Sequence, residues 1–402
     1  MDSLVNGKVY KVAVIGGGAS GLLTLLELLS GKDAISPSDV VLLERNDRVG
    51  KKILATGNGQ CNLSNVNVSE SNYHGDGELI KGFFKNFSQI NLIEYLKNFG
   101  IYTVSDETGR IYPVSRQASA VSDQLRSFIS SLNSEIITNF RVDGISYNGG
   151  IFSVGSGNNT VRAEKVVFAC GGSAGEGFGT DGTAYKLLEK FGHKTGALYP
   201  SIVKIKTERE KIKGLKNLKE RATVSILSGG KTVKEFTGDV LFTDYGVSGN
   251  AVYSLSAYIG DDTPVIKIKF LPDISDEELE KILEKRKNLP YINEHGVFVG
   301  LINKKIGCVI EKTAKSKSVK DLIYAVRNFD LKVLGTAGFD QAQTTKGGFS
   351  KGVNSLTYES EYQKGLFIVG EALDVDGDCG GYNLTFAFVS GIAAARSIKS
   401  KK

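Results

Sequence analysis

The stretch that decides the fold is Lys11-Val-Ala-Val-Ile-Gly-Gly-Gly-Ala-Ser-Gly-Leu-Leu-Thr-Leu-Leu26. It predicts a short buried strand, a turn with the spacing Gly16-x-Gly18-x-x-Gly21, and a helix that begins near Ala19. In this order the first glycine makes a tight turn, the second lets the backbone approach a pyrophosphate, and the third lets the helix lie against the strand. The free amides at the start of the helix, at the positive end of its dipole, then face the phosphates.

A second apolar strand supports this interpretation. The segment Val40–Leu43 ends in Glu44, which lies 23 residues beyond Gly21, about where a carboxylate that binds a ribose is expected. Such a glycine spacing alone occurs by chance in surface loops, but here the strand, turn, helix, second strand and acid follow in order. The sequence therefore predicts a dinucleotide-binding site; the alternative is a structural turn in another α/β fold.

The composition is that of a soluble globular protein with more than one domain. The chain of 402 residues exceeds the usual single core, and 50 basic against 44 acidic residues leave a net charge of only +6. The densest basic stretch, Lys204 to Arg221, also contains Glu208, Glu210 and Glu220, which is typical of a solvated face rather than a nucleic-acid surface. We expect a small-molecule substrate, no nucleic-acid or membrane partner, and a monomer or homodimer.

Few cysteines and histidines limit the remaining chemistry. The four cysteines, Cys61, Cys170, Cys308 and Cys379, are too few for a disulfide framework and form no Cys-x-x-Cys pair. The three histidines lie far apart in the sequence, so we expect no metal site. No apolar run reaches the length of a membrane span. The first apolar run is already the strand of the glycine turn, so we expect no leader and a cytoplasmic location.

The first half continues with alternating helical and strand patterns. Two strands, Arg141–Tyr147 and Ile151–Val154, are joined at Asn148-Gly149-Gly150, which predicts a hairpin. A further apolar strand, Lys165–Ala169, runs into Gly171 and makes a second junction of strand and glycine.

The pattern changes between residues 197 and 343. Four segments alternate apolar and polar residues, as half-exposed antiparallel strands do: 203–206, 222–227, 231–236 and 265–270. A capping box at Ser275–Glu278 then opens a helix, and helical spacing recurs at 301–310 and 319–326. We therefore divide the chain into residues 1–196 with 344–402, an inserted antiparallel β domain at 197–272 with 331–343, and a small helical domain at 273–330.

The C-terminal part returns to strands and glycines. Gly365–Glu371 predicts a buried strand that ends at a close backbone approach, and a glycine-rich loop over 374–383 leads into the apolar run Leu384–Ala395. That run predicts a helix whose N-terminus points back at the strand ends. We infer that the chain returns to complete the site of the first domain; the alternative is a packing helix after an ordinary glycine loop.

Four blocks of the sequence resemble one family. The blocks are Glu44–Asn65, Phe168–Gly182, Leu241–Gly249 and Gly370–Leu384. They are similar to the BaiN-like (YhiN-like) bacterial NAD(P)/FAD-dependent oxidoreductases, a group that includes aminoacetone oxidase-like flavoproteins. The resemblance spans almost the whole chain. It implies an α/β fold: a two-part, glutathione-reductase-like Rossmann domain that binds FAD, with an inserted β-barrel-like domain and a small helical domain.

The resemblance also implies which residues surround FAD. The pyrophosphate would be held by Gly16, Gly18, Ala19, Ser20 and Gly21, and the adenosine ribose by Glu44, with Arg45 and Lys52 on the adenosine and phosphate side. Beside the ribityl chain and the ring would run Asn58, Gln60, Cys61 and Asn62, while the backbone of Val142 would meet adenine. The matching blocks add Ala169, Gly171, Gly172 and Gly370. Towards the ribityl chain and phosphates would lie Glu371 and Asp374, and backbone contacts to the flavin pyrimidine would come from Gly381, Asn383 and Leu384.

In such a protein FAD carries the electron-pair transfer through flavin N5, while the protein supplies placement and electrostatics. A helix N-terminus at Asn383–Leu384 would stabilise negative charge at the pyrimidine edge. The candidate acid–base groups are Tyr382, Asp244 and Tyr245. The alternatives are a core aromatic role for Tyr382 and a surface turn for Asp244. Because no second Gly-x-Gly-x-x-Gly occurs, we expect NAD(P)H to dock transiently as the electron donor.

The reaction class stays open at this point. Members of the family resemble reductases of conjugated enones in one case and amine oxidases in another, and we prefer NAD(P)H-dependent reduction of an enone-type C=C bond. Gly171-Gly-Ser173-Ala-Gly175 also matches the nucleophile elbow of a hydrolase, although a glycine loop follows Ser173. A flavoprotein that modifies tRNA is a further alternative. A redox pair of Cys61 and Cys379 is the least favoured one.

Overall fold

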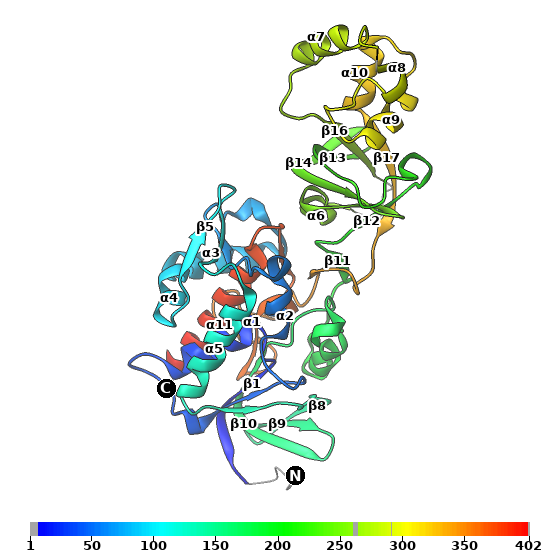
Figure 1. Ribbon diagram of the computed structural model, residues 1–402. Coiled ribbons are helices and arrows are strands. Elements are labelled where there is room, and N and C mark those ends of the chain that lie inside the picture. Colours follow the sequence, from blue (N-terminus) through cyan, green and yellow to red (C-terminus); the bar gives the residue numbers. More distant parts are fainter. Residues whose placement is uncertain (1–6, 260–263, 291, 401–402) are drawn as a thin grey trace. The chain divides into compact units, whose positions relative to one another are not determined.

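The computed structural model describes residues 7–259, 264–290 and 292–400. It divides into two compact units (Figure 1): the first comprises the chain up to Tyr199 together with the residues from Gln343 onward, and the second is Pro200–Ala342. The short strand β11 (Tyr199–Ser201) spans one junction between them. The separation of the inserted part into a β domain and a helical domain stays a prediction.

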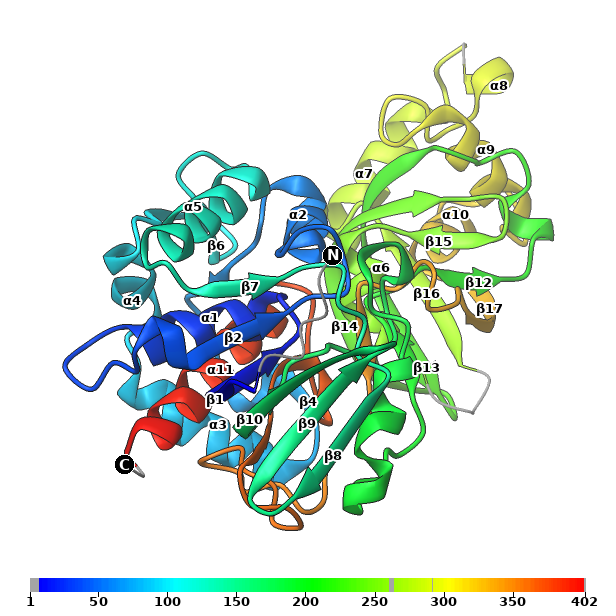
Figure 2. The ribbon, with the colours of Figure 1, turned by 90° about the horizontal axis from the view of Figure 1, so that it is seen from below.

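The first unit is built on a seven-stranded mixed sheet. Its order is β7-β2-β1-β10-β9-β8 (Figure 2). β19 pairs with β10 as well. The pairs β1–β2, β1–β10, β2–β7 and β10–β19 are parallel, whereas β8, β9 and β10 form an antiparallel meander. The strands are β1 (Val9–Ile15), β2 (Val40–Leu43), β7 (Glu135–Ile137), β8 (Gly144–Asn148), β9 (Ile151–Ser156), β10 (Asn159–Phe168) and β19 (Leu366–Ile368).

Two helices from opposite ends of the chain pack against each other in this unit. α1 (Ala19–Leu29) is buried from Ser20 to Leu29, because its sequence is apolar on nearly all sides. α11 (Tyr382–Ser400) contacts α1 closely, since a Cβ on Gly391 would come 2.4 Å from Ser20 O. The Thr24 hydroxyl donates to Ser20 O at 2.8 Å beneath this contact. Glycine at 391 thus allows the first and last helices of the fold to touch.

Smaller elements complete the first unit. The helices are α2 (Lys51–Ala55), α3 (Gly77–Gln89), α4 (Leu92–Asn98) and α5 (Ala118–Ser131). β3 (Ser64–Asn65), β6 (Arg110–Pro113) and β5 (Thr103–Ser105) form a small antiparallel sheet, β4 (Tyr73–Gly75) pairs with β20 (Val375–Gly377), and β18 is Thr344–Lys346. Helices α2 to α5 and strands β4 and β20 share one hydrophobic core with the main sheet, α1 and α11.

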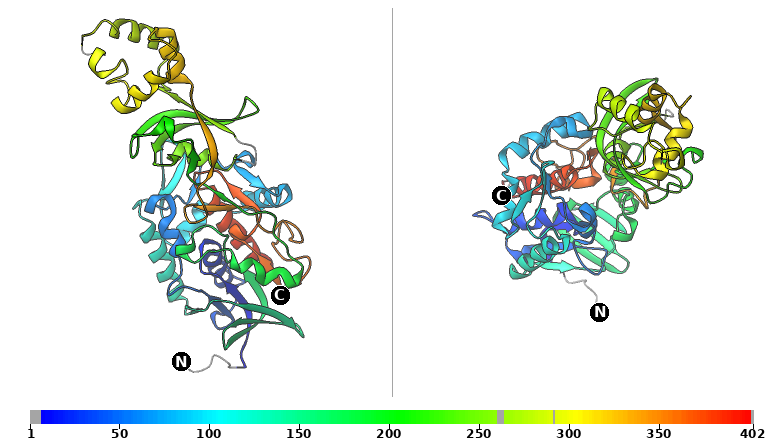
Figure 3. Two further views of the ribbon diagram at one scale, coloured as in Figure 1. Left: turned by 90° about the vertical axis from the view of Figure 1, so that its right-hand side faces the viewer. Right: turned by 45° about the horizontal axis from the view of Figure 1, so that its top comes forward.

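The second unit is a closed six-stranded barrel with helices. Its order is β12-β15-β14-β13-β16-β17. The strands are β12 (Ile205–Thr207), β13 (Lys219–Ser228), β14 (Lys231–Phe242), β15 (Gly246–Ser248), β16 (Val265–Phe270) and β17 (Phe329–Thr336). The helices are α6 (Asn250–Ser256), α7 (Asp276–Arg286), α8 (Ile292–His295), α9 (Lys304–Thr313) and α10 (Val319–Arg327). Figure 3 shows α7 to α10, in yellow-green to orange, gathered on one side of the barrel.

Most local predictions are confirmed, including the strand, turn and helix at the N-terminus, the hairpin of β8 and β9, and the cap of α7, where Ser275 Oγ accepts from Glu278 N–H at 3.1 Å. The strand predicted at Arg141–Tyr147 is wrong at its start, because β8 begins at Gly144. Val142 therefore lies in the preceding loop. There the Asp143 carboxylate accepts the Gly157 N–H at 2.7 Å and the Asp143 N–H donates to Gly155 O at 3.0 Å, so this loop is tied to the end of β9.

Candidate cofactor-binding site

Three parallel strands of the first unit end side by side, and the predicted site residues follow them. Ala169 N–H donates to Ile15 O at 2.8 Å, which joins the ends of β10 and β1. Val369 N–H donates to Phe168 O at 3.0 Å, which adds the end of β19. Ligands of open α/β sheets bind outside the carboxyl ends of their strands. The fold therefore brings glycine junctions from three distant parts of the sequence to one edge.

The first glycine turn has the geometry that its spacing predicts. Gly16 has φ 105°, and a Cβ there would lie 2.4 Å from Ala169 O. A Cβ on Gly21 would lie 1.9 Å from Gly16 O, so glycine is needed where α1 crosses β1. Gly18 differs, because a Cβ on it would meet no atom within 4 Å. The second glycine therefore faces open space, as a residue that admits a pyrophosphate should.

Glu44 lies beside this turn at the end of β2. Its side chain is buried, and Oε2 accepts the Gly17 N–H at 2.8 Å. Oε1 accepts both the backbone and the side-chain N–H of Asn46, each at 2.8 Å. The carboxylate thus ties β2 to the glycine turn and keeps acceptor oxygens at the position predicted for a ribose.

The C-terminal segment reaches the same place. A Cβ on Gly370 would come 2.5 Å from the Ser20 hydroxyl, in the first turn of α1. Gly370 N–H donates to Ser390 Oγ of α11 at 3.0 Å. The chain therefore returns to the glycine turn, as predicted, and the end of β19 packs between α1 and α11.

An ion pair joins two predicted cofactor residues that are far apart in the sequence. Lys52 Nζ donates to Glu371 Oε2 at 2.6 Å and to Ala174 O at 2.8 Å. Glu371 Oε1 accepts the Thr345 N–H at 3.0 Å, and Thr345 Oγ1 accepts the N–H groups of Ser173 and Ala174 at 2.8 and 3.0 Å. This network holds the loop after β10, with Gly171 and Gly172, against the loop after β19. No pattern in the sequence pointed to Thr345.

A second ion pair holds the far end of the same loop. Arg45 contacts Asp181 at 3.0 Å and donates to Gly179 O at 3.1 Å, while Arg141 lies 3.9 Å from Asp181. Burial opposes ionisation of Asp181, but hydrogen bonds from Thr183 and the Arg45 guanidinium outweigh it and lower its pKa to about 2. Arg45 thus fixes the loop beside Glu44.

We expect Asp181→Asn to lower the free energy of unfolding by about 1–2 kcal/mol near neutral pH. The folded-state pKa lies below the unfolded value, so the wild-type carboxylate stabilises the fold above about pH 4 and loses that effect as the pH falls towards about 2. The difference between the two proteins should therefore shrink by roughly half at about pH 3. Urea unfolding at several pH values measures it. A difference that is constant with pH would contradict the ion-pair explanation.

The turn after α2 is built from left-handed residues. Gly57 and Asn58 have φ 57° and 54°, and Asn58 and Gln60 are exposed. Cys61 is fully buried, and burial raises the pKa of its thiol to about 11 against a weaker opposing hydrogen bond with Thr56. Burial also raises the thiol pKa of Cys170 and Cys379, and all four cysteines are free. These three thiols are protonated at neutral pH and form no disulfide, which argues against a redox pair.

The second glycine turn precedes α11. Gly381 has φ 95°, and a Cβ on it would lie 2.4 Å from Ser64 O. When the side-chain amide of Asn62 is oriented with its oxygen towards Gly381, that oxygen accepts the Gly381 N–H at 3.2 Å. Tyr382 starts the helix, and its backbone carbonyl accepts from Tyr73 Oη at 3.0 Å. Burial and the nearby Asp378 carboxylate raise the pKa of the Tyr382 hydroxyl, so it is protonated at neutral pH.

The next residue, Asn383, fixes the start of α11. Its side chain accepts the Gly377 N–H at 2.8 Å and donates to Gly377 O at 2.7 Å. Leu384 is partly buried against the core. Asp374 lies just before β20, where burial and the Asp76 carboxylate raise its pKa against the opposing charge of Lys346.

The other two candidate acid–base residues belong to the second unit. Asp244 is exposed on the turn before β15 and forms an ion pair with Lys216 at 2.5 Å. Tyr245 Oη donates to Gln341 Oε1 at 2.9 Å. A catalytic role for either residue stays a prediction.

The hydrolase alternative does not fit the structure. Residues 171–175 follow β10, but no α-helix begins after Ser173, as a nucleophile elbow requires. The Ser173 N–H donates to Thr345, within the network of the loop. His193 is fully buried, and its Nε2 pairs with Ser360 Oγ at 2.7 Å.

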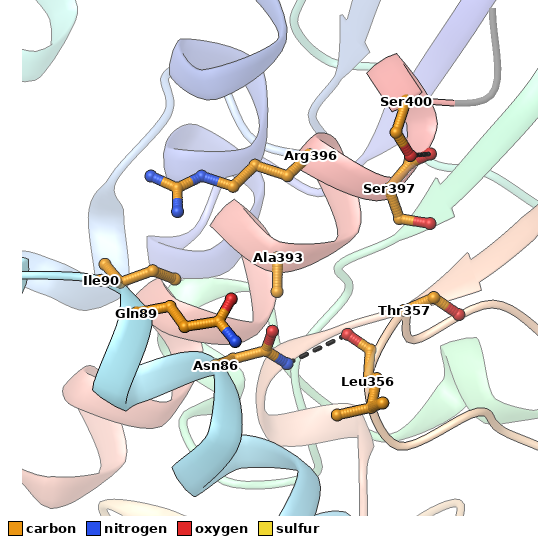
Figure 4. Close-up of a pocket in the computed structure, with 9 residues that line it drawn as sticks. All are labelled: Asn86, Gln89, Ile90, Leu356, Thr357, Ala393, Arg396, Ser397 and Ser400. Atoms are coloured by element: carbon orange, nitrogen blue, oxygen red, sulfur yellow. Dashed lines mark hydrogen bonds between the residues drawn. The ribbon is translucent and has the colours of Figure 1, made fainter.

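A pocket of about 290 Å³ lies elsewhere in the first unit (Figure 4). Its lining comes from α3, the C-terminal half of α11 and the loop before β19: Asn86, Gln89, Ile90, Leu356, Thr357, Ala393, Arg396, Ser397 and Ser400. Ala393 is 11 residues along α11 from Tyr382, or about 17 Å at the helical rise. None of the predicted cofactor residues lines this pocket, so it is distinct from the cofactor site.

The residues present fit FAD. The open space at Gly18 and the uncapped first turn of α1 suit a diphosphate, and the Glu44 carboxylate suits a ribose. Among the described residues, no group of three or more His, Cys, Asp or Glu side chains could hold a metal ion. No helix in the described ranges is long and apolar enough to cross a membrane. This fold and site define a Rossmann-type protein that binds FAD.

The chain belongs to the family described as HI0933-like protein Rossmann domain, whose model matches residues 10–397. It is 33% identical to a 3-dehydro-bile acid delta(4,6)-reductase of Clostridium scindens, with 96% of this chain and 98% of the relative covered. It is 28% identical to a ribosomal RNA dihydrouridine synthase of Haemophilus influenzae, covering 96% and 97%, and 26% identical to one of Escherichia coli, covering 98% and 99%. The protein is an FAD-dependent oxidoreductase of this family.

Proposed function

We propose that the protein reduces a C=C bond conjugated to a carbonyl in a small organic molecule, with NAD(P)H as the electron donor. The observation that carries this proposal is the convergence of the two chain ends on one sheet edge, where Gly370 meets Ser20. The relative with 33% identity is named as a delta(4,6)-reductase, which is a reaction of this kind. A location in the cytoplasm, where NAD(P)H is available, belongs to the same proposal.

The residues of the chain would bind the cofactor, position the loops around it and supply a proton. Bound FAD supplies hydride transfer at flavin N5. The turn at Gly16–Gly21 and Glu44 would hold its diphosphate and ribose, and Lys52 with Glu371 would fix the loops around it. Reduction of a polarised C=C bond also needs a proton. Because the Tyr382 hydroxyl is protonated at neutral pH, it suits a proton donor better than a base.

Anaerobic mixing of the FAD-loaded protein with NADH and with NADPH tests the proposal. We expect the yellow colour to bleach with one of them and to return on addition of a conjugated enone, with loss of the enone absorbance. Bleaching by aminoacetone but by neither nicotinamide nucleotide would overturn it in favour of an amine oxidase. Replacing Tyr382 with Phe should slow only the step in which colour returns.

A second candidate function follows from the other relatives. Both ribosomal RNA dihydrouridine synthases are named for saturating a uracil ring, whose C5=C6 bond is also conjugated to a carbonyl. The same site chemistry therefore serves an RNA base if the RNA is held by the protein. Mass spectrometry of nucleosides, after incubation of ribosomal RNA with the protein and NAD(P)H, tests for dihydrouridine.

A further inference from the structure

One segment of the second unit is rich in exposed lysine. α9, the turn after it and the start of α10 contain six lysines, all exposed, which we call the α9–α10 lysine face: Lys304, Lys305, Lys312, Lys315, Lys317 and Lys320. The stretch weighed in the sequence as a nucleic-acid surface, Lys204–Arg221, is a different one and mixes both signs. The lysine face spans two helices that pack against each other (Figure 1).

The carboxylates near this face are engaged in the fold, including Glu220, which accepts the Asn303 N–H at 2.9 Å at the start of α9. Glu311 points to the loop before α9, where its Oε1 accepts the Phe298 N–H at 3.4 Å. Asp321 lies in the first turn of α10 and accepts from Ser316 Oγ at 2.5 Å. In the described part of the chain, no carboxylate lies within 4.0 Å of any of the six lysine amines. Apart from Lys304, whose Nζ lies 3.2 Å from His295 Nδ1, these amines are therefore left for a partner from outside.

The neighbouring helix α7 shows what an ordinary solvated face looks like. Its sequence, Asp-Glu-Glu-Leu-Glu-Lys-Ile-Leu-Glu-Lys-Arg, alternates acids and bases, and Lys287 pairs with Glu284 after it. Such mixed faces neutralise themselves. The α9–α10 lysine face is neutralised less: its six lysines form no ion pair within the described residues, and the nearby acid Asp321 has its pKa lowered by hydrogen bonds from Ser316 and Ser318 and by the charges of Lys315 and Lys320.

The chemistry of the face favours RNA over a membrane. The apolar side of α9, with Ile306 and Ile310, is buried in the core of the unit, so no apolar face is left to enter a bilayer. Tyr324 lies one turn beyond Lys320 on α10 and is 62% exposed. Lysines beside an exposed aromatic ring suit phosphates and a stacked base together.

We propose that the α9–α10 lysine face binds RNA through its phosphate backbone, with Tyr324 stacking on an unpaired base. The proposal rests on the second candidate function, because a reductase of an RNA base needs a surface that holds RNA. Its test requires no turnover, so a failure to form dihydrouridine leaves the binding result unaffected.

The experiment compares two triple variants of the FAD-loaded full chain. One replaces Lys312, Lys315 and Lys317 with Gln; the matched control replaces Lys281, Lys285 and Lys287 of the α7 region with Gln, so both lose the same charge. The probe is a fluorescein-labelled RNA hairpin of about 20 nucleotides, followed by anisotropy over a range of salt concentrations. We expect the first variant to bind at least about tenfold more weakly and to lose about 2 units of the salt slope, while the control binds like the wild type.

Three outcomes would overturn the proposal. In the first, the wild type does not bind the hairpin; in the second, both variants bind it like the wild type. In the third, the first variant loses binding to vesicles that contain phosphatidylserine but keeps its RNA affinity, which assigns the face to a membrane. FAD content and thermal midpoint, measured for both variants, exclude misfolding. Tyr324→Leu should weaken binding to the unpaired loop more than to a fully paired duplex.

Discussion

Replacing Gly18 with alanine is expected to lower the affinity for FAD by roughly 10- to 100-fold and to leave the fold intact. A Cβ at this position meets no protein atom within 4 Å, and φ of −82° is an ordinary value for alanine. The methyl group would instead occupy the space predicted for the diphosphate and weaken one or two charge-assisted hydrogen bonds, each worth about 1.5–3 kcal/mol. Quenching of flavin fluorescence measures the affinity, and thermal unfolding of the FAD-free protein measures the fold.

Gly21→Ala provides the comparison, because its methyl group would lie 1.9 Å from Gly16 O. This variant must move α1 away from β1, so the thermal midpoint of the FAD-free protein should fall together with FAD binding. The two glycines thus separate a cofactor contact from a packing contact within one turn. If Gly18→Ala bound FAD as tightly as the wild type, the diphosphate would lie elsewhere and the assignment of the site would be wrong.

The parts of the fold that could be predicted are those specified locally. The strand, turn and helix at residues 11–26 follow from apolar runs and glycine spacing, and the structure has them as β1 and α1. Strand β16 alternates buried and outward-facing residues, so its pattern alone gave its bounds. The cap at Ser275 is local as well, since one side chain bonds an amide three residues on.

The parts that could not be predicted depend on contacts between distant residues. β14 continues to Phe242, beyond the predicted end at 236, because it pairs with β13 as far as Leu241 and with β15 at Leu241 and Phe242. Gly238 lies within this extension, where a Cβ would come 2.5 Å from Asn250 Oδ1 of α6. A glycine in the middle of a strand interrupts the alternation of apolar and polar residues that predicts a strand. The Lys52–Glu371 pair joins residues 319 positions apart, and no periodicity reports such a contact. The role of Thr345 could not be predicted for the same reason, since its partners, Ser173 and Ala174, lie in the loop after β10.

Asn383→Leu is expected to destabilise the protein and to make its flavin harder to reduce. The side chain holds both backbone groups of buried Gly377, and leucine would leave them unpaired, at a cost of about 2–4 kcal/mol in the free energy of unfolding. Loosening the start of α11 also weakens the positive helix end predicted to face the flavin pyrimidine. A helix terminus contributes about 0.5–2 kcal/mol, which for two electrons lowers the midpoint potential by about 10–40 mV.

Asn86→Leu is the matched control, because it removes one exposed hydrogen bond, from Asn86 Nδ2 to Leu356 O at 3.0 Å. Asn86 lies near the C-terminal half of α11, away from the start of that helix. It should change the free energy of unfolding by less than about 1 kcal/mol and leave the potential unchanged. Urea unfolding and a redox titration with a reference dye measure both quantities. If Asn383→Leu still bound FAD and kept the wild-type potential, α11 would not act on the flavin, and Asn383 would serve the fold alone.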